Sequence, residues 1–360
     1  MPTNSDSLRV AISKETAQGT LPATPVFEVF RVTGEGLSSE VSTTTSEEIN
    51  AISRGITDSI LTGATVTGDL MFELSNFEAF ELALASFVAS DWAADPIASG
   101  AAYPAGVGTN AGIYDSSEMS TFTIEKKMTS TPLDSAIQTE LFQVFSGCTA
   151  DTFNLSITPN EIITGSFGFI GMQATFPVAE TGDTYNESGF SPVMTAPLVT
   201  GIELLSHTTD GTEGTPVAWL TGSCFTGIEI SGSNNGRGLS CIGVLGNKAT
   251  SLGQFEISIS GSLYYTGNDP LDALVDQTPY QFRITCENSE GDSYFFFFPR
   301  VKFSAATALA SGTNTDVMVE FTMQALTDGF RKYTMEIERS PAPAAVAATT
   351  AKVKKNEEPV

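Results

Sequence analysis

Apolar and polar residues alternate with a period of two along most of the chain. In the segment 69–74, Leu70, Phe72 and Leu74 fall on one side of an extended backbone, and polar side chains fall mainly on the other. The same alternation recurs in the segments 152–157, 255–260 and 317–323. Strands with one buried face and one wet face are typical of antiparallel sheets, so the pattern predicts a mainly β protein.

Signals for helices are few and short. Ser75 followed by Glu78 predicts a capping box at the start of a helix that carries an apolar stripe. Asp269 and Pro270 predict the N-cap and first residue of a second helix. A third short helix is expected over 135–145, from the spacing of its apolar residues.

The order of the predicted elements repeats along the chain. Thr67-Gly68-Asp69-Leu70 ends a strand that leads into the first helix, and Ser260-Gly261-Ser262-Leu263 ends a strand that leads into the second. A strand, a pair of strands and a closing strand follow each helix. We therefore expect two copies of one strand–helix–sheet unit, at 36–178 and 200–338, although chance likeness between two β-rich halves is the alternative.

The segments outside the two expected units differ in composition. The expected division is an N-terminal arm at 1–35, a Gly/Thr/Pro-rich connector at 179–199 and a flexible tail at 339–360. Residues 38–48 are mostly Ser, Thr and Glu and cannot bury a face of their own. The segment 38–62 is therefore expected to form an exposed arm or hairpin that meets a partner, with disorder without function as the alternative.

The charge balance of the 360-residue chain is strongly acidic. It contains 17 Lys and Arg against 42 Asp and Glu, for a net charge of −25. Ordinary binding to a phosphate backbone needs clustered Lys and Arg, so the composition excludes it. Two interpretations stay open: acidity that serves solubility alone, or a surface that lies close to nucleic acid without holding it.

Residues that carry catalytic or metal chemistry are sparse and scattered. The four cysteines form no CxxC pair and are expected to be buried free thiols, and His207 is the only histidine. A Ser–His–Asp arrangement through His207 has less support than a histidine in a polar surface loop. We expect no catalytic residue, metal site or cofactor, and a protein that is not an enzyme.

The chain also lacks the sequence features of membrane insertion and export. The N-terminus has no basic region followed by an apolar one, and no apolar run approaches the roughly 18–20 residues that cross a bilayer. A soluble protein made in the cytoplasm is expected.

A series of short stretches occurs in a particular order and spacing between residues 14 and 335. They are Lys14-Glu15-Thr16, Gly19-Thr20-Leu21-Pro22-Ala23, Arg31-Val32-Thr33-Gly34-Glu35-Gly36-Leu37, Thr43-Thr44-Thr45-Ser46-Glu47-Glu48-Ile49, Gly63-Ala64-Thr65-Val66-Thr67-Gly68-Asp69, Phe72-Glu73-Leu74, Phe122-Thr123-Ile124-Glu125-Lys126, Phe145-Ser146-Gly147-Cys148, Ile163-Thr164-Gly165-Ser166-Phe167 and Phe298-Pro299-Arg300-Val301-Lys302-Phe303. In this order they resemble the major tail tube proteins of siphophages. Gln18 departs from the resemblance, because an aromatic residue is expected there.

The resemblance implies both a fold and a structural role. It implies β-sandwich units with short flanking helices, whose sheets join those of neighbouring subunits into a closed β-barrel ring around a wide lumen. Stacked rings then form the conduit for ejection of phage DNA, in a virion tail whose subunits are made in the host cytoplasm. Six units per ring are usual in that family, so a trimer of two-unit chains is favoured and a hexamer is the alternative. Implied partners are other copies of the chain, the tape measure protein, the tail terminator, the tail-tip proteins and passing DNA.

Two sets of residues are candidates for this role. On the wet faces of the predicted strands, Asp69, Glu73 and Glu256 are expected to line the lumen and repel DNA phosphates, with outer solvent as the alternative surroundings. The other set belongs to the 38–62 arm, which is expected to contact the adjacent ring. It comprises Glu47, Glu48, Ile49, Ile52 and Arg54.

A different function class also fits a β-rich chain. Adhesive or carbohydrate-binding β-sandwich modules carry exposed aromatic residues near polar clusters, and Trp92 and Tyr103 lie in a predicted loop. This is the alternative to the tail tube role.

Overall fold

A computed structural model of the chain describes residues 3–47, 55–92, 111–130, 140–187, 189, 191–219, 224–310, 312–313 and 315–340. The strands are β1 (Thr3–Lys14), β2 (Val26–Phe30), β3 (Gly34–Glu35), β4 (Ser38–Thr45), β5 (Ser59–Glu73), β6 (Ala111–Tyr114), β7 (Phe122–Ser130), β8 (Glu140–Ile157), β9 (Thr164–Gly171), β10 (Gln173–Thr175), β11 (Thr184–Asn186), β12 (Val199–Ser206), β13 (Phe225–Ser233), β14 (Arg237–Ser240), β15 (Asn247–Ser251), β16 (Glu256–Tyr264), β17 (Tyr280–Glu287), β18 (Ser293–Leu309), β19 (Met318–Ala325) and β20 (Glu336–Ser340). The helices are α1 (Glu78–Phe87), α2 (Asp269–Asp276) and the short 3-10 helix η1 (Ala196–Leu198). No helix in the described ranges is long and apolar enough to cross a membrane.

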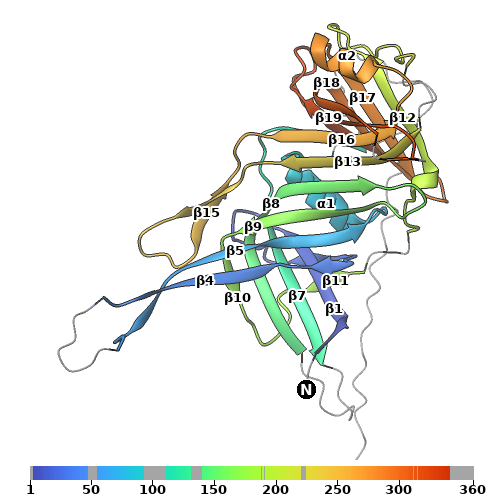
Figure 1. Ribbon diagram of the computed structural model, residues 1–360. Helices are drawn as coiled ribbons and strands as arrows, with labels where there is room; N and C mark the ends of the chain where they lie inside the picture. Colours follow the sequence, from blue (N-terminus) through green and yellow to red (C-terminus); the bar gives the residue numbers. More distant parts are fainter. Residues whose placement is uncertain are drawn as a thin grey trace, which may run out of the picture.

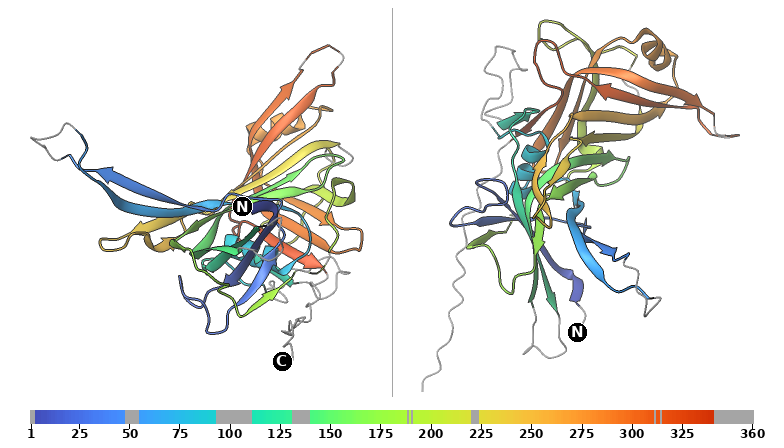
Figure 2. Two further views of the ribbon diagram at one scale, coloured as in Figure 1. Left: turned by 90° about the horizontal axis from the view of Figure 1, so that it is seen from below. Right: turned by 90° about the vertical axis from the view of Figure 1, so that its left-hand side faces the viewer.

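One curled sheet dominates the molecule. Its strands lie in the spatial order β4, β5, β9, β8, β13, β16, β19 and β18, and each neighbouring pair is antiparallel. Figure 1 shows β4, β5, β9, β8, β13 and β16 side by side, with α1 behind them. The sheet curls like part of a barrel wall, as Figure 2 shows from two further directions. The predicted mainly β fold is thus confirmed.

Two long strands leave this sheet and enter a second layer. The first part of β8 pairs with β7, and its second part pairs with β9. In the same way, β18 pairs first with β17 and then with β19. Register shifts lie between Ala150 and Thr152 in β8 and between Phe303 and Ala305 in β18. Such bulges bend a strand and let it turn the corner between two packed sheets.

Two sets of strands share one connectivity. The first set is β1, β4, β5, β7, β8 and β9, and the second is β12, β13, β16, β17, β18 and β19. Within each set the same five antiparallel pairs occur, for example β5–β9 and β16–β19, or β1–β7 and β12–β17. Each set also carries its helix at the same point in chain order, α1 after β5 and α2 after β16. The two sets join where β8 pairs with β13.

Glycines meet at corresponding places in the two sets. A Cβ on Gly68 would lie 2.3 Å from the carbonyl oxygen of Gly36, and the φ of Gly68 is +145°. A Cβ on Gly261 would lie 2.9 Å from the carbonyl oxygen of Gly227. In each set the two strands therefore approach too closely for a side chain, and Gly68 also adopts a backbone conformation that favours glycine.

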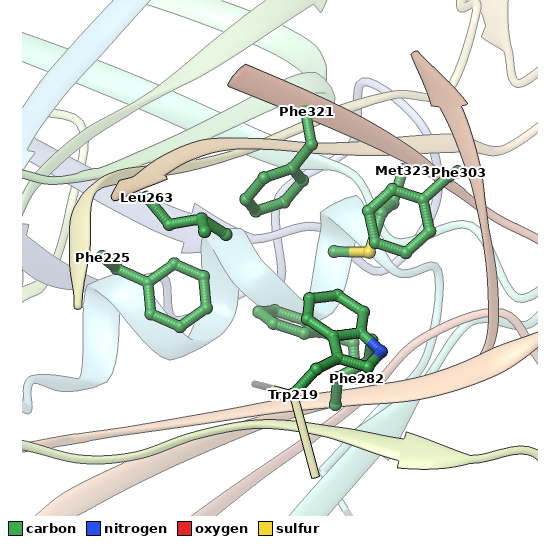
Figure 3. Close-up of a pocket in the computed structure, with 8 residues that line it drawn as sticks. Trp219, Phe225, Leu263, Phe282, Phe303, Phe321 and Met323 are labelled. Carbon is green, nitrogen blue, oxygen red and sulfur yellow. The ribbon is translucent and has the colours of Figure 1, made fainter. Parts of the chain in front are cut away.

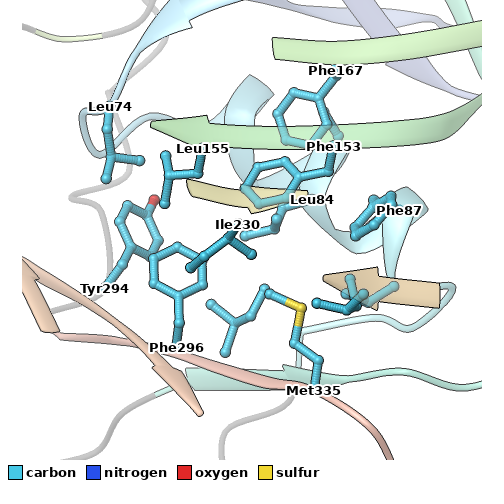
Figure 4. Close-up of a cluster of buried hydrophobic side chains, with 14 of the residues drawn as sticks. Leu74, Leu84, Phe87, Phe153, Leu155, Phe167, Ile230, Tyr294, Phe296 and Met335 are labelled. Carbon is cyan, nitrogen blue, oxygen red and sulfur yellow. The ribbon is translucent and has the colours of Figure 1, made fainter. Parts of the chain in front are cut away.

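An aromatic core lies between the curled sheet and α1. The ring centroid of Phe167 is 5.2 Å from those of both Phe72 and Phe153, and Phe80 of α1 packs 5.3 Å from Tyr294 of β18. Figure 4 shows Phe153, Phe167 and Tyr294 of this cluster among the strands and the helix. All five side chains are fully buried, which at about 1.5–3 kcal/mol for each large apolar side chain makes this core a major source of stability.

A second apolar centre lies within the second strand set. The ring of Phe303 lies 5.8 Å from that of Phe321 and 6.4 Å from that of Trp219, and Phe282 faces them. Figure 3 shows these side chains gathered around a common centre. The void between them is only about 10 Å³. The centre is therefore packed core and not a ligand pocket.

Most predicted strands are present, whereas some other expectations were wrong. The expected helix at 135–145 falls partly outside the described residues, and from Glu140 onward it is strand β8, in which Leu141 is exposed. The N-cap of α1 is Phe77 and makes no side-chain cap. Ser75 instead accepts a hydrogen bond from Arg31, so no capping box forms.

The expected N-terminal arm and connector take part in the fold. Strand β1 pairs with β2 and β7 and buries Val10 and Ile12, whose alternation marks a strand. Strand β11, within the expected connector, pairs in parallel with β2. Residues 3–30 therefore belong to the second layer of the first strand set and do not form a separate arm.

The four free cysteines differ in burial, two being buried and two exposed. Cys148 and Cys286 are buried free thiols, as expected, and burial raises the pKa of Cys286 to about 12. Cys224 and Cys241 are exposed, contrary to the prediction. The reason is their position: Cys224 precedes β13, and Cys241 lies in the turn between β14 and β15.

Candidate functional site

The curled sheet has one apolar face and one polar face. Residues such as Phe72, Phe153 and Ile259 point into the core, and their neighbours along each strand point the other way. We call the second surface the polar face. Its side chains include Asp69, Met71, Glu73, Thr152, Asn154, Ser156, Thr164, Ser166, Glu229, Ser231, Ser233, Glu256, Ser258, Ser260, Lys302, Thr307, Glu320, Thr322 and Gln324.

Strand register places two of the predicted lumen residues on one row across the sheet. Asp69 lies opposite Gly168, which lies opposite Thr152, and the row continues through Ser233 to Glu256. Four steps between strands separate the two acids, or about 19 Å along the sheet. A Cβ on Gly168 would lie 2.2 Å from Thr152 Oγ1 and 2.9 Å from Asp69 Oδ1, so the row is closely packed there.

The third predicted residue belongs to a parallel row. Glu73 lies opposite Thr164, Thr164 opposite Ser156, and Ser156 opposite Glu229. Glu229 accepts a hydrogen bond of 2.5 Å from Asn154 Nδ2. The structure therefore gathers Asp69, Glu73 and Glu256 on one face and adds Glu229 to them.

Two acids on this face were not among the candidates. Glu229 and Glu320 are exposed and lie between buried apolar neighbours, Ile228 and Ile230 for the first and Val319 and Phe321 for the second. The same period-two alternation that marks Asp69 was available for both. Applying it to every strand of the second half would have found them.

Acids outnumber cations on the polar face. Asp69, Glu73, Glu229, Glu256 and Glu320 form no ion pair with any described residue. Among the residues of these strands that the structure describes, Lys302 lies on this face, and alternation along β18 puts Arg300 on the same side of the strand. The uncompensated carboxylates give the face a negative potential.

The polar face is hollowed. An open groove of about 450 Å³ runs over β8, β13, β16, β19 and β18, and its polar lining includes Ser156, Glu229, Ser260, Thr307 and Glu320. The groove exposes hydroxyls and carboxylates and has no bundle of basic side chains. Such a surface lacks the clustered Lys and Arg that ordinary binding to a phosphate backbone requires.

The predicted arm is a hairpin built from β4 and the first part of β5. Beyond the pair Ser42–Gly63 it continues outward, and Ser46 N–H still donates to Asp58 O at 3.0 Å. Figure 2 shows the hairpin leaving the body of the molecule. Glu47 is exposed near its end. The other arm candidates, Glu48, Ile49, Ile52 and Arg54, lie outside the described residues.

His207 is held more firmly than a loop histidine was expected to be. Its Nε2 lies 2.9 Å from Asp328 Oδ1, and the two side chains are only 12% and 4% exposed. The Asp328 carboxylate also accepts the N–H groups of Phe330 and Arg331. Burial alone would raise the pKa of Asp328, but these hydrogen bonds outweigh burial and lower it below 3.8. The pair therefore fixes a turn.

We expect Asp328→Asn to destabilise the subunit by about 1–3 kcal/mol at pH 7, because a buried charged acceptor is lost. A lowered folded-state pKa stabilises the fold above the unfolded value near 3.8, and this contribution is lost as the pH falls through the folded value. The deficit of the variant should shrink below pH 3.8. Urea unfolding of both proteins at pH 7 and pH 3 checks this, and an equal deficit at both would contradict it.

The aromatic residue proposed for carbohydrate binding is not available for stacking. Trp92 Nε1 donates to the Glu81 carbonyl oxygen at 2.9 Å, and the guanidinium of Arg339 lies 4.8 Å from the indole centroid. Tyr103 lies outside the described residues. In the part of the chain that is described, the aromatic side chain named for an adhesive role is thus committed to internal contacts.

Comparison with known proteins assigns the family. None of the curated proteins compared with the chain matches it significantly. The model of a family described as phage tail tube protein matches residues 5–325, which is most of the chain and includes both strand sets. The family is one of structural components of the virion tail, subunits that assemble into a tube with other tail proteins. This chain belongs to the phage tail tube protein family.

Proposed function

We propose that the chain is the major tail tube subunit of a long-tailed phage, and that its rings stack into the conduit for the genome. The observation that carries the proposal is the polar face: an acid-bearing surface on a curled sheet of eight strands, hollowed by a groove over five of them. Closing such sheets into a barrel, concave side inward, makes the polar face the wall of the lumen.

The carboxylates on this wall act by repulsion. Asp69, Glu229, Glu256 and Glu320 repeat around each ring and along the stack, so a duplex meets like charge from every side. Screening at physiological salt reduces this field over about 8 Å, which confines the effect to DNA that comes close to the wall. Ser, Thr and Asn side chains between the acids hold water. The genome is thereby kept off the wall and slides.

The shared connectivity of the two strand sets supports two tail tube units in one chain. Six units per ring, as the family resemblance implies, then correspond to three chains, and a hexamer of chains is the alternative. Eight strands spaced about 4.8 Å apart contribute about 38 Å of circumference per chain. Three chains close a barrel about 37 Å across between backbones with upright strands, and a wider one when the strands tilt.

The remaining roles follow from a position in the tail. The lumen of the tube surrounds the tape measure protein during assembly, and its ends meet the tail-tip proteins and the tail terminator. The β4–β5 hairpin reaches the adjacent ring and fixes stacking. Its exposed Ile60 and Leu61 are apolar side chains that such a contact would cover. The subunits are made in the host cytoplasm.

Shortening the hairpin should block stacking but leave the subunit folded. Replacing residues 44–60 with Asn-Gly closes a two-residue turn and keeps the β4–β5 pairs up to Ser42. We expect single rings or free subunits in place of tubes. A control variant that replaces only Thr43 and Thr44 with serine should stack normally. Tubes of normal length from the shortened chain, seen by negative-stain electron microscopy, would refute the role of the hairpin.

The proposed function has a direct biochemical test. The purified chain, concentrated alone and with a tail-tip complex, is followed by sedimentation velocity and negative-stain electron microscopy. We expect rings or tubes with a central hole. A compact monomer under both conditions would exclude the proposed function.

A further inference from the structure

Two strand edges of the curled sheet have no partner among the described residues. The first is the outer edge of β4, which pairs only with β5. The second is the end of β18 from Ala305 to Leu309, which pairs only with β19, whereas Phe303 O just before it accepts a hydrogen bond from Gln277 Nε2. These are the two ends of the eight-strand sheet, and Figure 2 shows the β4–β5 and β18–β19 hairpins projecting in different directions. Long open edges are templates for pairing with another chain.

The backbone direction at the β4 edge is fixed by one hydrogen bond. Gly36 N–H donates to Asp69 O at 2.8 Å, so Gly36 turns its backbone groups toward β5. Alternation then turns Ser38 and Glu40 toward β5 as well, and leaves the N–H and C=O groups of Ser39 and Val41 directed to the open edge. The edge therefore presents donors and acceptors at a regular spacing.

The chain contains its own example of the missing joint. The end of β8 pairs with β13, and these strands hold the same places in their sets as β18 and β4. In that internal ladder, Asn154 lies opposite Ser231 and Thr152 lies opposite Ser233. The joint between β8 and β13 is thus a template for the two open edges.

The strand registers show which residues of β18 and β4 correspond to those of the joint between β8 and β13. Gly36 and Gly227 hold corresponding places, and this makes Glu40 correspond to Ser231 and Ser42 to Ser233. Thr152 lies opposite Gly168, and Thr307 lies opposite Glu320 at the matching place on β19. Thr307 thus corresponds to Thr152, and two residues further along each strand Leu309 corresponds to Asn154.

We propose that β18 of one chain pairs antiparallel with β4 of a second copy, with Thr307 opposite Ser42, Ala308 opposite Val41 and Leu309 opposite Glu40. This inference rests on the proposed function, since it supplies the joint that closes the ring. The contact is head to tail, and a head-to-tail contact forms a ring when its rotation closes. Each chain then has no unpaired edge in the curled sheet.

The exposure of the edge residues in the single chain, and the face on which their side chains lie, agree with this joint. Val41 is 62% exposed and Leu309 is 43% exposed in the single chain. In the proposed register Thr307, Leu309, Glu40 and Ser42 all lie on the polar face, so that face continues across the boundary between chains. Register slips of one residue would turn core-side and polar-side positions against each other.

A disulfide reports the register directly. In a Cys224→Ser/Cys241→Ser background, the exposed thiols are removed and the two buried ones remain. Leu309→Cys with Glu40→Cys places the new thiols at a pair without direct backbone bonds, where Cα atoms are about 4.5 Å apart and a disulfide fits. Oxidised rings on non-reducing gels should give a ladder of linked chains, with more than half of the protein linked and with three chains as the last band.

Two matched variants control the result. Asn154→Cys with Ser231→Cys should form the corresponding disulfide within one chain, seen as loss of free thiols without a change in band size. Leu309→Cys with Val41→Cys is one residue out of register and should link less than a tenth as much. Equal linking of Leu309→Cys with Glu40→Cys and with Val41→Cys would overturn the proposed strand pairing. Rings that form without a disulfide between Leu309→Cys and Glu40→Cys would overturn it as well. The absence of rings from the background protein would instead refute the proposed function.

Discussion

A subunit carrying Val41→Pro is expected to fold and to form no rings or tubes. Proline removes the N–H that Val41 directs to the open edge of β4, and it leaves the bonds of Glu40 and Ser42 to β5 in place. Edge strands tolerate proline on their free side, so the single chain should lose little stability. The neighbouring β18 would lose a central backbone bond and meet the proline ring.

The comparison protein is Val41→Thr, which keeps the N–H and the β-branched shape. Circular dichroism and thermal unfolding should be close to those of the unchanged chain for both variants. Sedimentation velocity should show assembly for Val41→Thr alone, with the ring fraction of Val41→Pro reduced at least tenfold. Rings of normal yield from a folded Val41→Pro would rule out pairing through this edge.

Phage assembled with Asp69→Lys should build tails of normal length and release DNA poorly. The Asp69 carboxylate lies on the polar face without an ion-pair partner among the described residues, so lysine there adds a free cation to the lumen wall. Each phosphate that the protein neutralises makes the logarithm of the binding constant fall more steeply with the logarithm of the salt concentration, by a slope of about 0.9. The slopes of several such contacts add. Stacked rings offer many, so DNA should be retained strongly at low salt and more weakly at high salt.

Glu290→Lys changes the net charge by the same amount in the turn between β17 and β18, away from the polar face. Plating efficiency should fall more than tenfold for Asp69→Lys and stay near normal for Glu290→Lys. Triggered DNA release, followed with a dye at 50 and 200 mM salt, should recover at the higher salt for Asp69→Lys. Equal release by the two variants at low salt would place Asp69 outside the lumen.

Period-two alternation carried most of what was predictable. It gave the strands around Leu70, Phe153 and Ile259 and placed Asp69 and Glu256 on wet faces, because side-chain direction along a strand is set locally. The same signal failed at 135–145, where apolar spacing fits a helix and a strand alike. From Glu140 onward, the long-range ladder to β7 decided in favour of a strand.

Joining the acids into one surface needed strand order, which no local pattern contains. Asp69 and Glu256 share a row only because β9, β8 and β13 lie between their strands in one register. Trp92 shows the same limit, since its place beneath Arg339 depends on β20, far along the chain. Sequence indicates which side of a strand is wet, and the fold determines which wet sides form one face.

The central claim is that the polar face is the wall of the lumen, and cryo-electron microscopy of the assembled tube tests it most directly. A map that resolves side chains should show Asp69, Glu229, Glu256 and Glu320 directed into the central channel, with β18 of each chain beside β4 of the next. The same map counts the chains in a ring, for which three are expected. A tube whose lumen is lined by other residues, with these four acids on its outer surface, would contradict the account.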